Sequence, residues 1–473
     1  MGAGAALLSA CGAVPDAPGT PAAPPDGHAG HTGPEGVAPA GGTVAAFTVP
    51  MPVPPVLAPS SSDATTDYYS LAARAGTEQL KPGVNTAILG FNGSYVGPTI
   101  RARKNRRVVL TYTNQLGAVT AVHLHGGHSV PSSDGFPTDT VAPGGSRVYE
   151  YANTQRAAPL WYHDHAHHLE SEHVYRGLHG FYLIDDPADD SLQLPSGAYD
   201  IPIMLTDARF AADGSLVFTQ NDMLGRTSLL ANGRVTPFFP VARRKYRFRV
   251  LNASNLRHFT LQLGGLVQMS VVGTDGGLLA NPVQTPVLVL SPGERLDVVI
   301  NFAPYAIGTQ LVLRDVTGGS VLRFDVTSTA SDNSQVPGTL RALPPLGSPT
   351  VSRTINLSSS GSTFTINGRT FDPNRVDASI RAGATELWTI VNNDPGGHGH
   401  NFHLHLVQFR VLDRNGRAPE PWEVGLKDTV MVGNRETVRV QVTFGTQLGR
   451  SVYHCHLIDH SALGMMARMD IVP

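Results

Sequence analysis

Residues 92–114 have the sequence NGSYVGPTIRARKNRRVVLTYTN. An Asn-Gly dipeptide comes first, Pro98 follows it, and the apolar run Val108–Asn114 ends the stretch. Asn-Gly is typical of tight turns between β-strands, and β-branched and aromatic residues favour strands. The stretch therefore predicts a turn followed by a strand that ends in asparagine.

The same order of signals occurs twice more in the chain. The two further copies are Asn232-Gly233, Pro237 and Tyr246–Asn252, then Asn367-Gly368, Pro373 and Leu387–Asn392. The copies begin 140 and 135 residues apart, which suits whole domains and not solenoid units of about 20–50 residues. We expect three β-sandwich domains of similar topology, with boundaries near residues 187 and 348.

Other patterns also favour an all-β chain. Glu436–Val442 alternates polar and apolar residues, as a half-buried strand does. Val287–Leu290 is an apolar run that Ser291-Pro292-Gly293 ends. No segment has a convincing length and period for a helix, although short helices near 155–175 are compatible with the sequence. A chain of 473 residues is also too long for a single hydrophobic core.

The overall charge and the N-terminus narrow the class of protein. The net charge is −2 with no basic stripe, so nothing indicates nucleic acid. No apolar stretch is long enough to span a membrane as a helix. Leu8-Ser9-Ala10-Cys11 resembles the lipobox of bacterial lipoproteins, although no Lys or Arg precedes it. Residues 12–45 are rich in Pro, Gly and Ala, which predicts a flexible linker.

These features predict an exported protein, periplasmic or at the cell surface. Cys11 would then be a lipid anchor, and the first 45 residues a truncated signal with its linker. A chance match in an Ala-rich leader is the alternative interpretation of Cys11. The chain has one other cysteine, Cys455, in a very different context.

Histidines are concentrated in four places. Residues i and i+2 of a strand point to the same face, so a His-x-His pair directs two imidazoles to one place. Imidazole suits copper, zinc, iron or nickel. The sequence therefore predicts one pocket with eight nitrogen ligands, from the pairs His123/His125, His163/His165, His403/His405 and His454/His456.

The last pair also indicates a second metal site. Cys455 lies between His454 and His456, so its side chain points to the opposite face of the strand. With His400, His460 and Met465 it forms the ligand set of a blue-copper electron-transfer site. A zinc site would more often add a second cysteine or a water. The structural alternatives are a buried Cys455 and a Met465 that only packs in the core.

The adjacency of the two sites suggests a use for them. Cys455 shares its backbone with His454 and His456, so a short covalent path joins the blue-copper site to the eight-histidine pocket. Eight imidazoles fit three coppers. Four coppers in all match the four electrons that convert dioxygen into two waters.

The four clusters resemble, in order and spacing, the copper-binding motifs of three-domain multicopper oxidases. This family includes laccases, bilirubin oxidases and bacterial cuprous oxidases. The resemblance covers about residues 85–473 and extends to Gly97-Pro98-Thr99-Ile100, Asp134-Gly135-Phe136-Pro137 and Gly180–Ile184. It implies three consecutive cupredoxin-like Greek-key β-sandwich domains. They would span residues 46–187, 188–347 and 348–473, with the type 1 copper in the last.

The resemblance also implies four copper ions and the residues that hold them. Asp134 matches an acidic residue thought to assist proton delivery to oxygen in relatives; its alternative role is that of a turn residue before Gly135. The implied ligands are His400, Cys455, His460 and Met465 for type 1, His123 and His403 for type 2, and His125, His163, His165, His405, His454 and His456 for the type 3 pair.

Two departures from the family pattern matter for function. Many bacterial relatives carry Glu just after the last type 1 histidine, where this chain has Ser461. Either Asp459 substitutes for that carboxyl, or the proton route differs. The stretch between Met269 and Met431 contains no methionine, whereas cuprous oxidases often carry a Met-rich insertion that gathers Cu(I). This absence favours organic substrates.

The leading hypothesis is a monomeric laccase-type enzyme. Its partners would be dioxygen and a small reducing substrate, a phenol or aromatic amine, that docks in a broad hollow beside His460. The first alternative is a metallo-oxidase acting on Cu(I), Mn(II) or Fe(II). The second is a structural relative without catalysis, which the intact ligand set disfavours.

Overall fold

The computed structural model describes residues 45–473; Cys11 and nearly all of the predicted linker lie outside the described residues. The described part is built from strands in six sheets, with two short helices, α1 (Glu170–Arg176) and α2 (Ile458–Ala462). The prediction of an all-β chain is therefore confirmed. No helix in residues 45–473 has the length and apolarity to cross a membrane.

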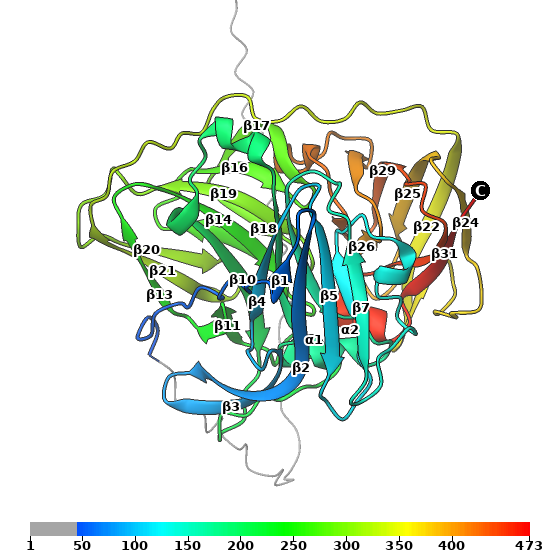
Figure 1. Ribbon diagram of the computed structural model, residues 1–473, viewed down its shortest axis with the longest axis horizontal. Helices are drawn as coiled ribbons and strands as arrows, with labels where there is room; N and C mark the ends of the chain where they lie inside the picture. The colour runs from blue at the N-terminus through cyan, green and yellow to red at the C-terminus, as the bar shows by residue number, and fades with distance from the viewer. Residues whose placement is uncertain (1–44) are drawn as a thin grey trace, which may run out of the picture. The chain divides into compact units, whose positions relative to one another are not determined.

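The sheets follow one another in pairs, and each pair encloses one core (Figure 1). In the first domain one sheet has β1 (Ser61–Ser62), β2 (Thr66–Lys81), β3 (Val84–Phe91), β5 (Arg107–Asn114) and β7 (Ser146–Tyr151). The other has β4 (Gly97–Arg103), β6 (Val122–His125), β8 (Ala158–Asp164) and β9 (His179–Asp185).

The middle domain has the largest sheet. Its strands are β10 (Asp200–Ala208), β11 (Ser228–Ala231), β12 (Arg234–Val235), β14 (Lys245–Asn252), β16 (Met269–Thr274), β17 (Gly277–Thr285) and β19 (Arg295–Asn301). The facing sheet has β13 (Phe238–Ala242), β15 (Phe259–Leu263), β18 (Val287–Leu290), β20 (Gln310–Asp315) and β21 (Gly319–Ser328).

The third domain again packs two sheets. One has β22 (Val351–Ser360), β23 (Thr363–Ile366), β25 (Thr385–Asn392), β27 (Phe409–Arg414) and β29 (Glu436–Thr443). The other has β24 (Ala378–Arg381), β26 (His400–Leu404), β28 (Thr429–Val432), β30 (Gly449–His454) and β31 (Met466–Val472). Four short 3-10 helices lie in loops: Pro131–Ser133, Pro187–Leu192, Gly197–Tyr199 and Pro421–Val424.

The repeat seen in the sequence is a repeat of topology. In each domain a first strand pairs in parallel with the strand that ends in asparagine: β2 with β5, β10 with β14, and β22 with β25. The terminal residues Asn114, Asn252 and Asn392 are fully buried. Each donates from Nδ2 to one backbone carbonyl in the loop that follows and to a second one 27–40 residues farther along the chain. A buried amide that is fully bonded in this way fixes the end of the strand.

The Asn-Gly dipeptides have an equally local explanation. Asn92, Asn232 and Asn367 have φ between 46° and 54°, and the glycine after each is also left-handed. This is the geometry of a type I′ turn, which asparagine and glycine tolerate best. Each asparagine Oδ1 also accepts a backbone amide from a neighbouring strand, from Ala72, Met204 and Asn356 respectively.

The strands predicted from local patterns are present. Val287–Leu290 is β18, and the alternating stretches at 246–250 and 436–442 lie in β14 and β29. The short helix expected near 155–175 is α1, which begins later, at Glu170, and ends where Gly177 adopts φ 119°. The loop between β8 and β9 that contains α1 leads directly from the second histidine pair.

Candidate copper centres

Four strands from two domains carry the histidine pairs. In the first domain β6 pairs with β8, and His123 lies opposite His163. In the third domain β26 pairs with β30, and His403 lies opposite His454. The second member of three pairs, namely His165, His405 and His456, comes one or two residues after its strand ends. Both domains therefore present their histidines from strand ends.

The eight histidines form three groups, in each of which the ligand atoms lie within 4.8 Å of one another. The groups are His123/His125/His403, His125/His163/His456 and His165/His405/His454. In three of the four pairs the two members fall in different groups, whereas His123 and His125 share one group and His125 also belongs to a second. The ring centroids within a pair are 4.9–5.8 Å apart. This refines the expectation that each pair is aimed at a single point. The arrangement fits one type 2 and two type 3 coppers.

The chemistry of these side chains fits metal binding. His123 Nε2, His163 Nε2, His403 Nε2 and both nitrogens of His456 are buried and have no hydrogen-bond partner among the described residues. A buried polar atom without a partner is costly unless a ligand satisfies it. Burial, reinforced by neighbouring histidines, lowers the pKa of His125 and His403 well below its usual value. Neutral imidazoles with free lone pairs are the form that binds copper.

The tightest of the three groups shows the fit most clearly. The Nε2 atoms of His165, His405 and His454 are 3.1–3.3 Å from one another. Imidazole–metal bonds of about 2.0 Å in a tetrahedral arrangement separate ligand nitrogens by about 3.3 Å. The triangle therefore already has the size that three ligands of one ion require.

Hydrogen bonds at the other ring nitrogen fix the orientation of several histidine rings. Asp134 accepts from two of them: its backbone oxygen from His123 Nδ1 at 2.6 Å and its Oδ2 from His405 Nδ1 at 3.0 Å. Asp428 does the same for His403 Nδ1, through its backbone oxygen at 2.8 Å, and for His125 Nε2, through Oδ1 at 2.8 Å. Such partners select the tautomer and raise ligand basicity. The sequence singled out Asp134 but not Asp428.

The type 1 residues gather around Cys455, which directly follows β30, with His400 from β26 and His460 from α2. Cys455 Sγ is 3.7 Å from His400 Nδ1 and 3.9 Å from His460 Nδ1, and the two nitrogens are 3.2 Å apart. His400 Nε2 donates to Asp394 Oδ2 at 2.9 Å, which leaves Nδ1 for the metal. Burial raises the pKa of the Cys455 thiol to about 12, so the thiolate needs a bound cation to form.

Two neighbouring methionines take different directions. Met465 is fully buried in the same core as Cys455, and its carbonyl accepts from the Cys455 amide at 3.0 Å. Met466 begins β31 and packs with Phe136 and Val452 instead. Met465 is thus the methionine on the side of the predicted type 1 site.

The middle domain supplies no ligand but supports the eight-histidine cluster. The buried Arg295 donates from Nη1 and Nη2 to the two oxygens of Asp428, both at 2.6 Å. It also donates to backbone oxygens of Pro159 and Gly293. Gly293 has φ 88°, and a Cβ there would lie 2.9 Å from His456 Nδ1. The one weak signal for Arg295 in the sequence is a charge at the start of a mostly apolar strand.

Asp459 joins helix α2 to the middle domain. Its Oδ1 accepts from Ser171 and from Asn255 Nδ2, and its Oδ2 accepts from Arg226 Nη2 at 2.8 Å and from the amide of Asn221. Both Arg226 and Asp459 are fully buried. A carboxylate with four donors is committed to structure, which argues against the alternative that Asp459 takes the place of the missing carboxyl at Ser461.

The surroundings of His460 differ from the expected broad hollow. Only 6% of the residue is exposed, and the ring of Phe364 on β23 stacks on it with centroids 3.9 Å apart. Phe364 is itself only 5% exposed. The ring of His460 is therefore screened by an aromatic side chain and does not open on a wide depression.

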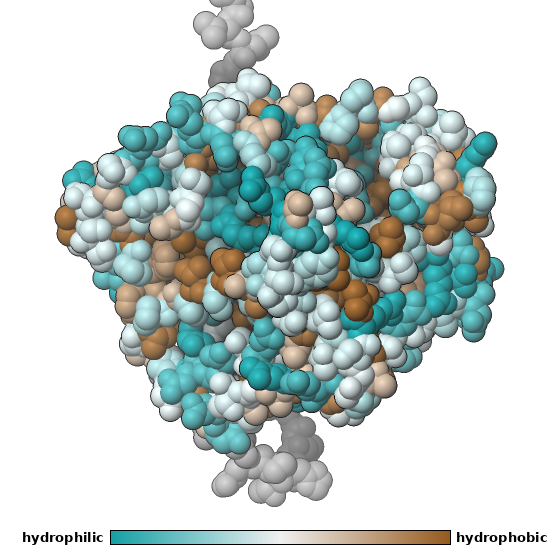
Figure 2. Space-filling view, viewed as in Figure 1, coloured by the Kyte–Doolittle hydropathy of each residue, from teal (hydrophilic) through white to brown (hydrophobic). Residues whose placement is uncertain are grey.

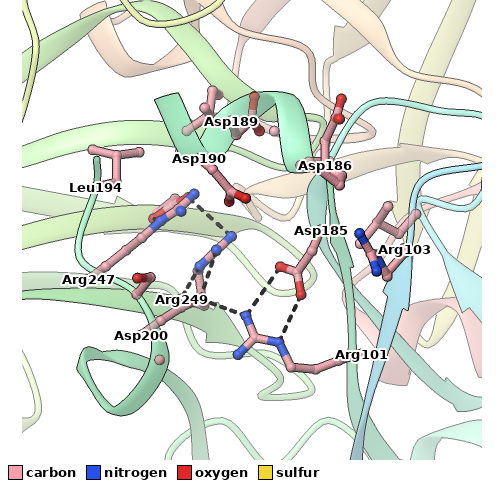
Figure 3. A pocket seen from close by; sticks show the side chains of 18 of the residues that line it. Arg101, Arg103, Asp185, Asp186, Asp189, Asp190, Leu194, Asp200, Arg247 and Arg249 are labelled. Atoms are coloured by element: carbon pink, nitrogen blue, oxygen red, sulfur yellow. Dashed lines mark hydrogen bonds and ion pairs between the residues drawn. The ribbon is translucent and has the colours of Figure 1, made fainter. Parts of the chain in front are cut away.

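A cavity of about 630 Å³ lies away from both copper centres, between the first and middle domains (Figure 3). Its walls are ion pairs: Arg101 with Asp185 and Asp200, and Arg249 with Asp200 and Asp297. Hydrophilic residues likewise line the hollowed upper centre of the face in Figure 2. Because these charges compensate one another, the cavity is a polar seam between domains.

Comparisons with known proteins identify the family and the fold. Three family models, each described as multicopper oxidase, match residues 73–189, 207–329 and 344–473. A bilirubin oxidase from Albifimbria verrucaria is 37% identical, with 90% of this chain and 81% of that protein covered. A laccase from Bacillus subtilis (strain 168) is 34% identical over 91% and 99%. A laccase crystal structure from Pediococcus acidilactici matches with TM-score 0.86 and 33% identity, over 90% and 94%.

Proposed function

Because the chain belongs to the multicopper oxidase family, we propose that it is a laccase-type oxidase of small phenolic and aromatic donors. The oxidoreductase activity and the four-copper cofactor follow from the family and from the histidine groups. The choice of donor class is the proposal. One observation carries it: an aromatic ring, that of Phe364, covers His460.

The surroundings of His460 favour an organic donor over a metal ion. Phe364 stacks on the ring, and the carboxylate of the neighbouring Asp394 is taken by His400 Nε2 and by the amide of Gly396. A metal-ion substrate would need free carboxylate, thioether or imidazole ligands at the point of entry. An aromatic donor needs only a stacking surface and close approach.

The residues of the chain perform the remaining tasks. Bound copper supplies one-electron storage, so that dioxygen can receive four electrons without release of partly reduced oxygen. Cys455 links the type 1 site covalently to His454 and His456, which belong to different type 3 groups. Asp134 and Asp428 hold the rings at fixed tautomers. Burial of the whole cluster excludes bulk water.

Oxygen uptake by the copper-loaded protein tests the donor class. We expect faster uptake with a substituted phenol than with Cu(I) at equal concentration, pH and ionic strength. Faster uptake with Cu(I) would instead support the metallo-oxidase alternative. A Cys455→Ser variant is the control in both arms, since uptake that persists in it does not pass through the type 1 site.

A further inference from the structure

Glu170 is a buried carboxyl that the copper sites do not use. It is the first residue of α1, and only 1% of it is exposed. Its Oε1 accepts from the hydroxyl of Ser461 on α2 at 3.4 Å. Its Oε2 is buried and has no partner among the described residues. The other acidic residue of α1, Glu172, forms an ion pair with Arg176, whereas the Glu170 carboxyl has no ion pair among the described residues.

Its environment keeps a proton on Glu170 at neutral pH. Burial raises the pKa of Glu170 to about 8, against weaker opposition from its own backbone amide and the Ser461 hydroxyl. An ionised carboxylate in such a place would be costly, because nothing compensates its charge. Glu170 therefore holds a proton that it can release within the physiological pH range.

The titratable groups around Glu170 come from the residues before α1 and from the elements packed against it. Just before α1, His168 Nδ1 donates to Ala462 O on α2 at 2.8 Å, and the ring of His167 lies against that of His168. Helix α1 packs against β3, β8 and α2, and β3 has no titratable side chain. On β8, Asp164 accepts from His173 Nδ1 at 3.0 Å and from the amide of Ala121, and the ring of His163 lies in the histidine cluster. The hydroxyl of Tyr162, also on β8, donates to Pro98 O at 2.6 Å. On α2, Asp459 has four donors and His460 faces Cys455. No cation pairs with Glu170 among these elements.

Its position connects the two copper sites. Helix α1 begins five residues after His165, a member of one type 3 group, and the Glu170 amide donates to Ala166 O at 2.9 Å. The hydroxyl that contacts Glu170 belongs to Ser461, the residue directly after the type 1 ligand His460. Figure 1 shows α1 and α2 side by side near the centre of the molecule. A carboxyl from the first domain thus fills the place beside Ser461.

We propose that Glu170 is the proton-relay residue for dioxygen reduction in this chain, acting with Ser461. Reduction of one dioxygen to two waters consumes four electrons, which the reducing substrate supplies, and four protons. In each proton step the O–H bond of Glu170 breaks and its proton moves towards the oxygen between the histidine groups. The Ser461 hydroxyl lies 3.4 Å from Oε1 and 3.0 Å from Ile458 O, so it turns from that carbonyl to give its proton to the carboxylate. Ser461 then takes a replacement proton that comes ultimately from solvent.

A Glu170→Gln variant tests the relay with almost no change of shape. We expect reoxidation of the reduced, copper-loaded enzyme by dioxygen to slow by about 10- to 100-fold, within the range for loss of a general acid or base. Electron uptake by the type 1 site should stay unchanged. The reoxidation rate of the wild type should fall as pH rises through about 8, where Glu170 loses its proton, and the variant should lack this fall. Glu172→Gln, on the same helix but partly exposed and paired with Arg176, is the matched control.

Two further measurements separate a relay from a structural role. Infrared difference spectra of the copper-loaded protein should show a protonated carboxyl band at pH 6 that Glu170→Gln lacks and that the wild type loses above about pH 8. The double variant Glu170→Gln/Ser461→Glu, which returns a carboxyl from the opposite side, should recover at least about tenfold of the lost rate. Wild-type reoxidation in Glu170→Gln, absence of the band, or a slow variant that the second carboxyl does not rescue would each overturn the proposal.

Discussion

The type 1 site and the eight-histidine cluster are assembled in different ways. His400, Cys455, His460 and Met465 all come from the third domain, within 66 residues of chain. The cluster takes four histidines from the first domain and four from the third, and a buried arginine from the middle domain braces it. The type 1 site is therefore complete when one domain has folded, whereas the cluster exists only when three domains are docked.

This difference separates local from global requirements. A substitution at a type 1 ligand should change that site alone, because its neighbours stay in place. A substitution at a domain contact should release the cluster first, because its ligands depend on the docking. Substitutions at the type 1 site and at the cluster therefore test whether the two sites can be disturbed independently.

Loss of Cys455 should have the largest effect on the type 1 side of the comparison. In Cys455→Ser the hydroxyl replaces a soft thiolate that copper prefers, so the intense blue colour and substrate oxidation should both disappear. Type 2 and type 3 copper should remain, because His454 and His456 keep their positions. Absorption and electron paramagnetic resonance spectra measure this. A blue and active variant would disprove the type 1 assignment.

Loss of Arg295 should disturb the eight-histidine cluster and leave the type 1 site intact. Arg295→Met leaves Asp428 buried without its partner, a defect that typically costs about 3–5 kcal/mol. We expect a lower unfolding temperature and loss of type 2 and type 3 copper, while the folded fraction keeps its blue colour. Arg341→Met is the control, since that arginine forms a part-exposed pair with Asp189 worth at most about 1 kcal/mol. Equal loss of all four coppers would show that the sites are not independent.

The contrast between local sequence patterns and contacts of distant segments also explains which features the sequence could predict. His454-Cys455-His456 predicts two metal sites from three adjacent residues, because alternation along a strand places the Cys455 side chain opposite those of its neighbours. The Asn-Gly turns and the terminal asparagines are equally local. Arg295 and Asp428 are 133 residues apart. No sequence pattern around either residue indicates that the two form an ion pair.

Glu170 and Phe364 illustrate the same limit. In the sequence Glu170 is one acid on a short polar helix, an ordinary solvated residue. It is buried because α1 packs against β3, β8 and α2, and α2 comes nearly 300 residues later in the chain. Phe364 is an apolar residue of a short strand, and nothing local indicates that it covers His460. Fold class and ligand types follow from local periodicity; enclosure of the sites depends on tertiary contacts.

Asp134→Asn should weaken the cluster without dismantling it. The carboxylate accepts from His405 Nδ1 and from Ser451 Oγ, and an amide keeps the shape but not the charge. Removal of such a partner typically costs about 10- to 100-fold in activity or metal affinity. Stopped-flow reoxidation by dioxygen should slow by that factor, while uptake of the first electron at the type 1 site stays as in wild type. Equal reoxidation rates would remove Asp134 from dioxygen reduction.

Phe364→Leu should alter access to the type 1 site but not the site itself. The variant loses an aromatic contact with His460 that is worth about 0.5–1.5 kcal/mol of stability. We expect kcat/KM to rise for bulky phenols, because the ring that screens His460 is smaller. The blue absorption should be unchanged. If kcat/KM stays the same for small and bulky phenols alike, electrons enter elsewhere.

Met465→Leu should have the smallest effect and shows how finely the type 1 site is tuned. Leucine fills almost the same volume, so the stability cost should stay below about 1.5 kcal/mol. A thioether donates electron density to oxidised copper and an alkyl chain does not, so the reduction potential should rise while copper stays bound. Met466→Leu is the control, because Met466 packs against Phe136 and Val452. A redox titration in which Met466→Leu shifts the potential and Met465→Leu does not would move the axial position by one residue. Cys455 and Met465 share one core cluster, which indicates that Met465 is the axial ligand; that result would contradict this indication.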